Sequence, residues 1–289
     1  MKKIGVVGAG MMGSEIALTF ALAGHQVYLT DRNLAQTNAA ITNLQAVLSR
    51  GIKRGQFEPM QSERALKCIT TGVELSGYED CEVVIEAVFE DAVVKGETYQ
   101  RLVPFLRDDC ILASNTSSIS ITALSGNLLP EQRARFLGTH YFSPVTRMPL
   151  VEVIPGLDTA VATVDTMFDL LKSVGKEPIR VKDVVGFAVN RVLHMFFIEA
   201  TRLVEEGVIS VEDMDKACKL GLGHPIGPFE LMDVTTNNLG LEVQDILHHH
   251  YGERFLPRPI LRNIVAAGYN GKKYGRGWYK YVEGKRVIE

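Results

Sequence analysis

Residues 2–31, KKIGVVGAGMMGSEIALTFALAGHQVYLTD, decide the fold of this chain. Residues 4–7 form a short, mainly β-branched run that stops at Gly8, and the apolar residues that follow recur at helical spacing. A second β-rich run covers residues 26–30. Strand, turn, helix and strand therefore follow one another without a gap, and this order predicts a βαβ unit.

The turn of this unit contains Gly8, Gly10 and Gly13, which have the G-x-G-x-x-G spacing. The first glycine permits the tight turn, the second lets the backbone approach a pyrophosphate, and the third lets the helix pack on its strand. Asp31 follows the second strand, where a carboxylate can accept both ribose hydroxyls of an adenosine. The alternative is a purely structural turn, but the complete context favours dinucleotide binding. Asp31 also favours NAD over NADP, because a 2′-phosphate would meet like charge.

Composition excludes several classes of protein. The 289 residues suggest about two domains, and 46% hydrophobic and 22% charged residues are ordinary for a globular protein. A formal net charge of −3 gives no sign of a nucleic-acid surface. We expect no membrane span, since no segment approaches the ~20 apolar residues that one needs. The N-terminus enters a strand at once, so we expect no signal peptide and a protein that is cytoplasmic or is the mature form of an organelle enzyme.

Polar residues follow predicted strands at the edge where open α/β sheets bind ligands. A buried strand over residues 82–87 is interrupted by an acid, Glu86, at its carboxyl end. Glu86 and the following Glu90 are therefore candidates, together with Lys95 on the next helix. The strand 111–114 runs into Asn115-Thr116-Ser117-Ser118. These four residues could cap a helix over 119–124, or they could contact a ligand.

Two strands each contain one residue that interrupts an apolar pattern. His140 lies in the predicted strand 136–142, and Glu152 lies in the predicted strand 150–154. A single histidine in a strand is usually a satisfied core residue. A histidine and a glutamate on successive strands, both embedded in apolar sequence, predict instead that each satisfies the other.

A basic cluster and four cysteines leave alternatives open. Arg50, Lys53 and Arg54 end a predicted helix over residues 33–54. They fit either a solvated helix end that favours the dipole or a grip on a phosphorylated substrate. The cysteines have no CxxC pairing, so we expect reduced thiols rather than metal ligands. They are Cys68, Cys81, Cys110 and Cys218.

The pattern changes after Asp183, where we place the domain boundary. Residues 186–207 read as one long helix with few polar positions, and residues 221–233 read as a glycine and proline loop leading into another helix. The three consecutive histidines 248–250 resemble a metal motif, but neighbouring helical residues point ~100° apart and cannot converge on one ion. We therefore predict no metal site.

Ordered motifs make this chain resemble the 3-hydroxyacyl-CoA dehydrogenases. The motifs are NTSS at 115–118, HYFSP at 140–144, LVEV at 150–153, DVVGFAVNR at 183–191, HPIGPFELMD at 224–233 and GKKYGRGWYKY at 271–281. The resemblance implies an α/β fold class. A Rossmann-type NAD domain (1–183) would be followed by a smaller all-helical domain (184–289) that closes the substrate cleft and forms a homodimer. The implied ligands are NAD and an acyl-CoA thioester, with no nucleic acid, membrane or metal.

Site residues carry over from the resemblance position by position. The implied catalytic residues are His140, Glu152, Ser117 and Asn190. The implied cofactor-binding residues are Gly8, Gly10, Met11, Met12, Gly13, Asp31, Arg32, Glu90, Lys95, Asn115, Ser117, Ser143 and Lys273. The implied substrate-binding residues are Asn43, Arg50, Ser117 and Asn190. The chain departs from the family at Ser143, where an asparagine is usual.

The resemblance and the residues together predict a mechanism. Oxidation of a secondary alcohol at C3 of a thioester needs a base for the hydroxyl proton, and an imidazole that titrates near neutrality serves in both directions. His140 is the predicted base, oriented by Glu152. A dehydrogenase of a free hydroxy acid or sugar acid is an alternative that would not need the basic grip near Arg50. A non-catalytic dinucleotide-binding protein is another, against which His140 and Glu152 argue.

Overall fold

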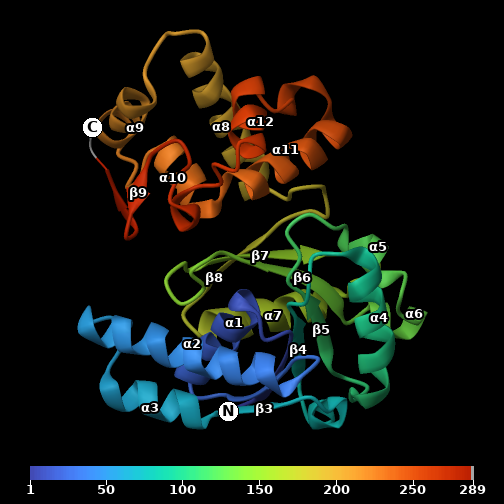
Figure 1. Cartoon of the computed structure of the whole chain (residues 1–289). Coiled ribbons are helices and arrows are strands. Elements are labelled where there is room, and N and C mark those ends of the chain that lie inside the picture. Colours follow the sequence, from blue (N-terminus) through green and yellow to red (C-terminus); the bar gives the residue numbers. More distant parts are fainter. Residues whose placement is uncertain (288–289) are drawn as a thin grey trace. The chain divides into compact units, whose positions relative to one another are not determined.

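The computed structural model describes residues 1–287. Contacts between residues divide the chain into two compact units, Met1–Val184 and Val185–Glu289. We call them the α/β unit and the helical unit and describe each by itself (Figure 1).

A single eight-stranded sheet organises the α/β unit, in the order β3-β2-β1-β4-β5-β6-β7-β8. The strands are β1 (Lys3–Val7), β2 (Gln26–Thr30), β3 (Ile69–Gly72), β4 (Val83–Glu86), β5 (Ile111–Ser114), β6 (Phe136–Tyr141), β7 (Leu150–Pro155) and β8 (Glu177–Arg180). All neighbours run parallel except β6 and β7, which are antiparallel. The order reverses direction between β1 and β4, which is the point where doubly wound sheets bind ligands.

Helices cover both faces of this sheet, because its strands alternate their side chains between two apolar layers. Ile4 and Val6 of β1 join a core with residues of α1, α2 and α7. On the opposite face, Tyr99 of α4 meets Phe136 of β6 edge-on, with ring centroids 5.4 Å apart. The helices are α1 (Met11–Leu22), α2 (Leu34–Lys53), α3 (Pro59–Lys67), α4 (Ala92–Leu102), α5 (Ile121–Ser125), α6 (Pro130–Arg133) and α7 (Val161–Ser173).

Among the described residues of the helical unit, one small apolar core forms around Phe229 and another around Leu247. Its helices are α8 (Val189–Glu205), α9 (Val211–Gly221), α10 (Pro228–Thr235), α11 (Asn237–Tyr251) and α12 (Pro259–Ala266). A short hairpin, β9 (Tyr281–Val282) and β10 (Lys285–Arg286), follows them. Among residues 1–287, no helix is both long and apolar enough to cross a membrane.

The predicted fold class is confirmed, and two local predictions need correction. Residues 221–233 are not a loop throughout, because α10 begins at Pro228. Proline at the first helical position needs no hydrogen-bond donor there, so it starts this helix rather than preventing it. The cap of α5 is Ser120, whose hydroxyl accepts from the N–H of Ala123, and the polar residues 115–118 therefore do not cap it.

Candidate active site

The glycine-rich turn joins β1 to α1 at the carboxyl edge of the sheet. Gly8 has a φ of 100°, and a Cβ on Gly13 would lie 1.8 Å from the carbonyl oxygen of Gly8. The fold itself therefore requires both glycines. A Cβ on Gly10 would meet nothing within 4 Å. The protein alone gives no reason for glycine at this position, whereas a ligand lying against the backbone does.

The start of α1 offers backbone donors beside this turn. No side chain caps the helix, and its first turn carries no acid. Within residues 1–287, no group accepts a hydrogen bond from the backbone N–H of Met11, Met12 or Gly13. Three open donors at the positive end of a helix dipole suit a phosphate, so the residues present fit a bound dinucleotide.

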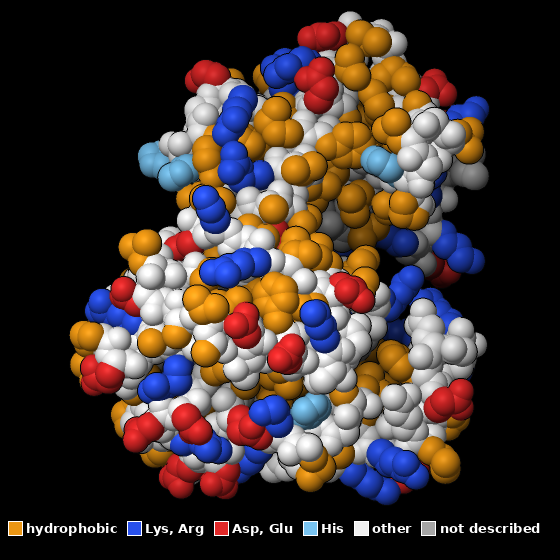
Figure 2. All heavy atoms as spheres, turned by 180° about the vertical axis from the view of Figure 1, so that it is seen from behind, with side chains coloured by type: hydrophobic (Ala, Val, Ile, Leu, Met, Phe, Trp, Pro, Cys, Tyr) orange, Lys and Arg blue, Asp and Glu red, His pale blue; other side chains and the backbone are white. Residues whose placement is uncertain are grey.

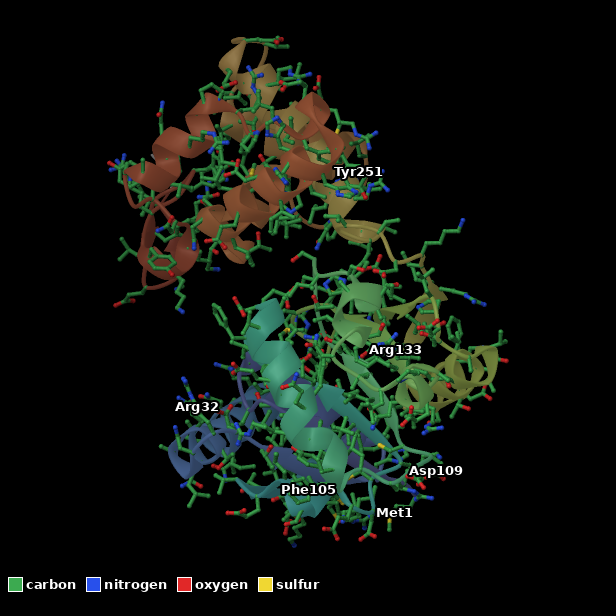
Figure 3. The ribbon with its side chains drawn as sticks, turned by 90° about the vertical axis from the view of Figure 1, so that its right-hand side faces the viewer. Met1, Arg32, Phe105, Asp109, Arg133 and Tyr251 are labelled. Carbon is green, nitrogen blue, oxygen red and sulfur yellow. The ribbon has the colours of Figure 1, made fainter. Side chains whose placement is uncertain are left out.

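Asp31 lies directly beside the glycine turn, at the end of β2. Its Oδ2 accepts from the N–H of Ala9 at 2.7 Å, and its Oδ1 accepts from the N–H of Arg32 at 2.8 Å. Figure 3 shows Arg32 at the margin of the α/β unit, where its side chain is exposed. The structure thus holds the carboxylate next to the turn, as a contact with an adenosine ribose requires.

His140 and Glu152 face each other across the antiparallel pair β6 and β7. The distance between His140 Nδ1 and Glu152 Oε2 is 2.8 Å, and the two side chains are 6% and 0% exposed. A buried carboxylate is stable when such a donor satisfies it. The predicted pairing is therefore confirmed. A hydrogen on Nδ1 that Glu152 accepts leaves Nε2 as the other ring nitrogen.

The loop after β5 lies beside the end of β6, which carries His140. Asn115 Oδ1 accepts from the N–H of Tyr141 at 3.1 Å. Glu90 fixes the next residues, since its Oε1 accepts from the Thr116 hydroxyl at 2.6 Å and from the N–H of Ser117 at 2.8 Å. Within residues 1–287 the Ser117 hydroxyl has no hydrogen-bond partner. It is therefore available to a ligand.

Opposing influences set the pKa of Glu90. Burial favours the neutral acid, but the Lys95 ammonium and the hydrogen bonds from Thr116, Ser117 and Ser118 outweigh it and hold the pKa of Glu90 below its ordinary value. Its side chain remains 36% exposed. Glu90 is thus an anion that both shapes the loop and reaches the surface at the ligand edge.

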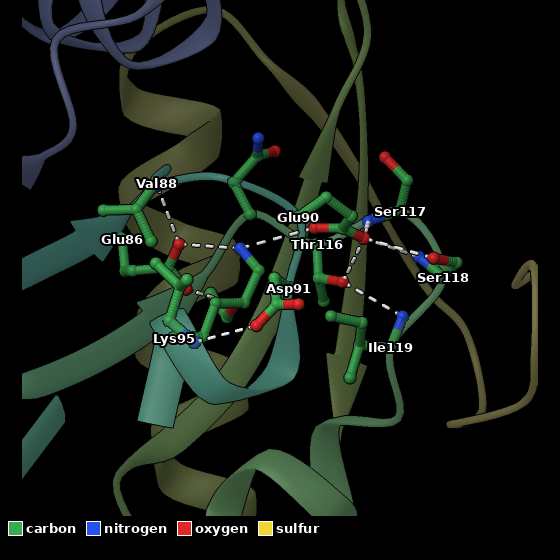
Figure 4. Close-up of polar contacts among 12 residues, drawn as sticks. Glu86, Val88, Glu90, Asp91, Lys95, Thr116, Ser117, Ser118 and Ile119 are labelled. Atoms are coloured by element: carbon green, nitrogen blue, oxygen red, sulfur yellow. Dashed lines mark hydrogen bonds and ion pairs between the residues drawn. The ribbon is translucent and has the colours of Figure 1, made fainter. Parts of the chain in front are cut away.

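Lys95 and Glu86, two other candidates at this edge, have no exposed surface. Figure 4 shows the Lys95 ammonium between two carboxylates, 2.7 Å from Glu86 Oε1 and 3.4 Å from Glu90 Oε2. Glu86 therefore contacts no ligand directly in this conformation. The cofactor contact implied for Lys95 remains a prediction, and the present geometry connects Lys95 to the edge through Glu90.

A basic hollow of about 330 Å³ lies between α2 and the loop after β6. Arg50, Arg54 and Arg147 line it, and none of them forms an ion pair within residues 1–287. The acid in its lining is Glu15, which is largely buried. Asn43 is exposed two turns before Arg50 on α2. Three unpaired guanidinium groups around one hollow favour the phosphate-binding alternative over a solvated helix end.

Two implied site residues belong to the helical unit. Asn190 lies half-buried in the first turn of α8, and Lys273 is exposed in the short 3₁₀ segment Lys272–Tyr274. The histidines 248–250 are consecutive on α11, and no group of three or more metal-ligating side chains is found in residues 1–287. All four cysteines are free thiols. Burial raises the pKa of Cys81 to about 11.

Two family models together match nearly the whole chain. The NAD binding domain of 3-hydroxyacyl-CoA dehydrogenase matches residues 3–184, and the C-terminal domain of 3-hydroxyacyl-CoA dehydrogenase matches residues 186–281. The chain belongs to the 3-hydroxyacyl-CoA dehydrogenase family. The resemblance predicted from the ordered motifs is confirmed, and NAD is the cofactor.

Relatives match this chain over nearly its full length. A mitochondrial hydroxyacyl-coenzyme A dehydrogenase of Mus musculus is 38% identical, over 97% of this chain and 91% of that protein. A 3-hydroxybutyryl-CoA dehydrogenase of Clostridioides difficile is 35% identical, over 96% of this chain and 99% of that protein. The crystal structure of (S)-3-hydroxybutyryl-CoA dehydrogenase from Ralstonia eutropha aligns with a TM-score of 0.92 at 36% identity. The alignment covers 98% of this chain and 100% of that chain.

Sequence reasoning missed three residues that take part in the contacts described above. Tyr99 and Ser114 donate to Glu86, and Arg147 completes the basic hollow. Tyr99 follows Lys95 by four residues, so helical spacing could have placed both on one face. Arg147 follows a proline turn, and no periodic signal in the sequence indicates that it lies beside Arg50 of α2.

Proposed function

We propose that this 3-hydroxyacyl-CoA dehydrogenase oxidises a 3-hydroxyacyl-CoA at C3, with His140 as general base and Glu152 as the residue that orients it. The observation that carries the mechanism is the 2.8 Å contact between His140 Nδ1 and Glu152 Oε2, buried at the end of two paired strands. This geometry selects one tautomer and stabilises the imidazolium that forms, as the orienting acid does in a catalytic triad.

Three side chains of the protein have a defined task in this mechanism. His140 Nε2 takes the proton of the C3 hydroxyl in oxidation and returns it in reduction. NAD, when bound, would supply the acceptor for the hydride that leaves C3. The Ser117 hydroxyl donates to a substrate oxygen and so fixes the alcohol for proton transfer. Asn190 is assigned to the same oxygens from its family motif.

The cofactor contacts follow the open groups at the ligand edge. The N–H groups of Met11, Met12 and Gly13 are assigned to the pyrophosphate, and Asp31 is assigned to the adenosine ribose. The remaining assignments rest on the family motifs. They are Arg32, Glu90, Lys95, Asn115, Ser143 and Lys273.

The basic hollow supports a CoA substrate over a free hydroxy acid. Arg50 and Arg54, with Arg147 opposite, offer a delocalised positive charge suited to phosphate, and a free acid has no phosphate to place there. Asn43 lies on the same helix and is assigned to the CoA moiety with them. A spectrophotometric assay at 340 nm tests this preference. We expect the enzyme to oxidise NADH with acetoacetyl-CoA and not with acetoacetate.

A matched pair of variants tests the mechanism. Glu152→Gln should lower kcat by ~10² and leave the dissociation constant of NADH unchanged, because imidazolium stabilisation is lost while the glycine turn is untouched. Glu177→Gln makes the same change at an exposed position one strand away and should retain wild-type kcat. A Glu152→Gln enzyme with wild-type kcat would overturn the assigned role of Glu152.

We also propose a homodimer formed through the helical unit. Figure 2 shows hydrophobic side chains gathered on a face of this unit, and Val192, Leu220 and Leu222 are 73%, 78% and 64% exposed. Such exposure is typical of an interface. Light scattering should return twice the chain mass of 31.9 kDa at micromolar concentration. The cytoplasmic location remains a prediction, which fractionation of the source cells tests.

A further inference from the structure

We propose that Glu86, Tyr99 and Ser114 are positioning residues, which act through Lys95 and Glu90 to fix the loop that carries Ser117. The proposal rests on the proposed function, since that function assigns Ser117 a contact with the substrate oxygen. None of the three residues can touch substrate or cofactor directly, because none has exposed surface.

Glu86 is the anchor of this arrangement. Its Oε1 accepts from Lys95 Nζ at 2.7 Å and from the N–H of Val88 at 2.8 Å. Its Oε2 accepts from the hydroxyl groups of Tyr99 and Ser114, each at 2.7 Å. Four donors, from the segment after β4, from α4 and from β5, surround one carboxylate, so it has a single well-defined position.

Lys95 transmits this position to the surface. Its ammonium contacts Glu86 on one side and Glu90 on the other (Figure 4). A buried cation between two carboxylates has little freedom, because movement away from either leaves a charge without its partner. The location of the Glu90 carboxylate is therefore tied to Glu86, although Glu90 itself is part of a loop.

Glu90 in turn folds the loop after β5. One oxygen, Oε1, accepts from the Thr116 hydroxyl at 2.6 Å, from the Ser117 N–H at 2.8 Å and from the Ser118 N–H at 3.1 Å. The loop has no regular secondary structure of its own. Its shape thus depends on the carboxylate that it surrounds, and the buried anchor behind that carboxylate sets where the Ser117 hydroxyl is presented.

Two substitutions weaken the anchor without changing its volume. Glu86→Gln removes the negative charge that holds Lys95, and Tyr99→Phe removes one of the four donors. A misplaced contact of about 1 Å is enough to slow catalysis severely, so kcat with 3-hydroxybutyryl-CoA and NAD should fall about tenfold in Glu86→Gln and about threefold in Tyr99→Phe. The dissociation constant of NADH should rise by a smaller factor than kcat falls, because the glycine turn and Asp31 are untouched and only the contacts assigned to Glu90 and Lys95 are affected.

Tyr78→Phe is the matched control for the milder variant. Tyr78 is also completely buried in the α/β unit, and its hydroxyl donates to the carbonyl of Val6 at 2.8 Å, outside the anchor. Tyr78→Phe and Tyr99→Phe each remove one buried tyrosine hydroxyl. The Tyr78 hydroxyl also contacts the Thr30 hydroxyl at 2.6 Å, so the control loses at least as many contacts as Tyr99→Phe. A merely structural role for Tyr99 predicts the same modest effect on kcat in both variants.

Hydrogen–deuterium exchange gives a readout besides activity. In Glu86→Gln and Tyr99→Phe, exchange at residues 115–119 should be faster than in the wild type, and in Tyr78→Phe it should be unchanged. Wild-type kcat and unchanged exchange at 115–119 in Tyr99→Phe would overturn the positioning role. If the wild type oxidises 3-hydroxybutyryl-CoA and Tyr99→Phe does so equally well, the positioning role is wrong while the proposed function stands. An inactive wild type with fast exchange only in the anchor variants would instead overturn the proposed function.

Discussion

Two regions of this protein bury carboxylates in different ways. In the α/β unit, Glu90 shares the Lys95 ammonium with Glu86, and its pKa lies below the ordinary value. In the helical unit, the donors to Asp215 and Asp233 found within residues 1–287 are all neutral, and the pKa values of these two acids lie above the ordinary value. Burial is the largest influence on all three groups and raises each pKa. In the first region the Lys95 cation, together with the hydrogen bonds from Thr116, Ser117 and Ser118, reverses the direction of the shift.

The donors of the helical unit show how far neutral hydrogen bonds can go. Asp233 accepts from Asn237, from the backbone N–H of Trp278 and of Tyr279, and from the Tyr281 hydroxyl, at 2.9 to 3.0 Å. Four contacts fail to offset the burial of this carboxylate. They do attach the C-terminal segment to α10. A cation therefore keeps a ligand-edge carboxylate charged, whereas neutral donors suffice where a carboxylate only holds structure together.

Removal of the cation should have the largest effect. Lys95→Met leaves the Glu86 carboxylate buried without its partner, and breaking a buried ion pair in this way costs about 3–5 kcal/mol of unfolding free energy. Urea denaturation measures the loss. Lys219→Met is the control, because Lys219 pairs with Glu230 at a site where its side chain is 35% exposed, and such a pair contributes under about 1 kcal/mol. Equal losses in the two variants would contradict the comparison.

His194 extends the contrast to a buried base without a counter-charge. It lies on α8, its Nδ1 has no hydrogen-bond partner in residues 1–287, and burial lowers its pKa to about 4. Between pH 6.5 and 4 His194 is protonated in the unfolded chain but stays neutral in the folded protein. The free energy of unfolding therefore falls as pH falls. The full difference is about 3 kcal/mol. His194→Leu should lose less stability than the wild type over this range, as measured by urea denaturation at pH 7 and 4.5.

Asp233→Asn should have a smaller effect, confined to the helical unit. The amide keeps one acceptor oxygen and places its NH₂ group against donors, which costs about 1–3 kcal/mol. Hydrogen exchange should then quicken at residues 271–281, which Asp233 attaches to α10. Exchange at residues 115–119 should stay as in the wild type. Faster exchange in both segments would show that the two regions are not independent.

The sequence predicted the parts of the site that depend on local pattern. The glycine turn, Asp31 and the pairing of His140 with Glu152 follow from residue spacing and from interruptions of strand periodicity, and the structure contains each of them. The anchor behind Glu90 was not predicted. Ser114 is 28 residues from Glu86, and a serine at a strand end looks the same whether or not a buried carboxylate lies beneath it.

The helical unit was predicted less completely, for a related reason. Its carboxylates bind donors that are distant in sequence, as Asp233 and Tyr279 are, and no periodicity indicates such pairs. The start of α10 was also missed, because proline signals either a loop or a first helical turn. Tertiary contacts decide between these alternatives, and they become visible only in the fold.

The smallest expected effect is the sign of a pH slope, and it tests the comparison most directly. An acid whose pKa is raised by folding binds protons more tightly in the folded state, so the stability advantage of the wild type over Asp233→Asn should grow as pH falls toward the ordinary pKa of 3.8. Glu90 has a lowered pKa, so the advantage of the wild type over Glu90→Gln should shrink as pH falls below the ordinary value of 4.5. Urea midpoints for the three proteins between pH 5.5 and 4 measure both slopes, and His194 affects all three equally. Slopes of the same sign would mean that Lys95 does not control the charge of Glu90.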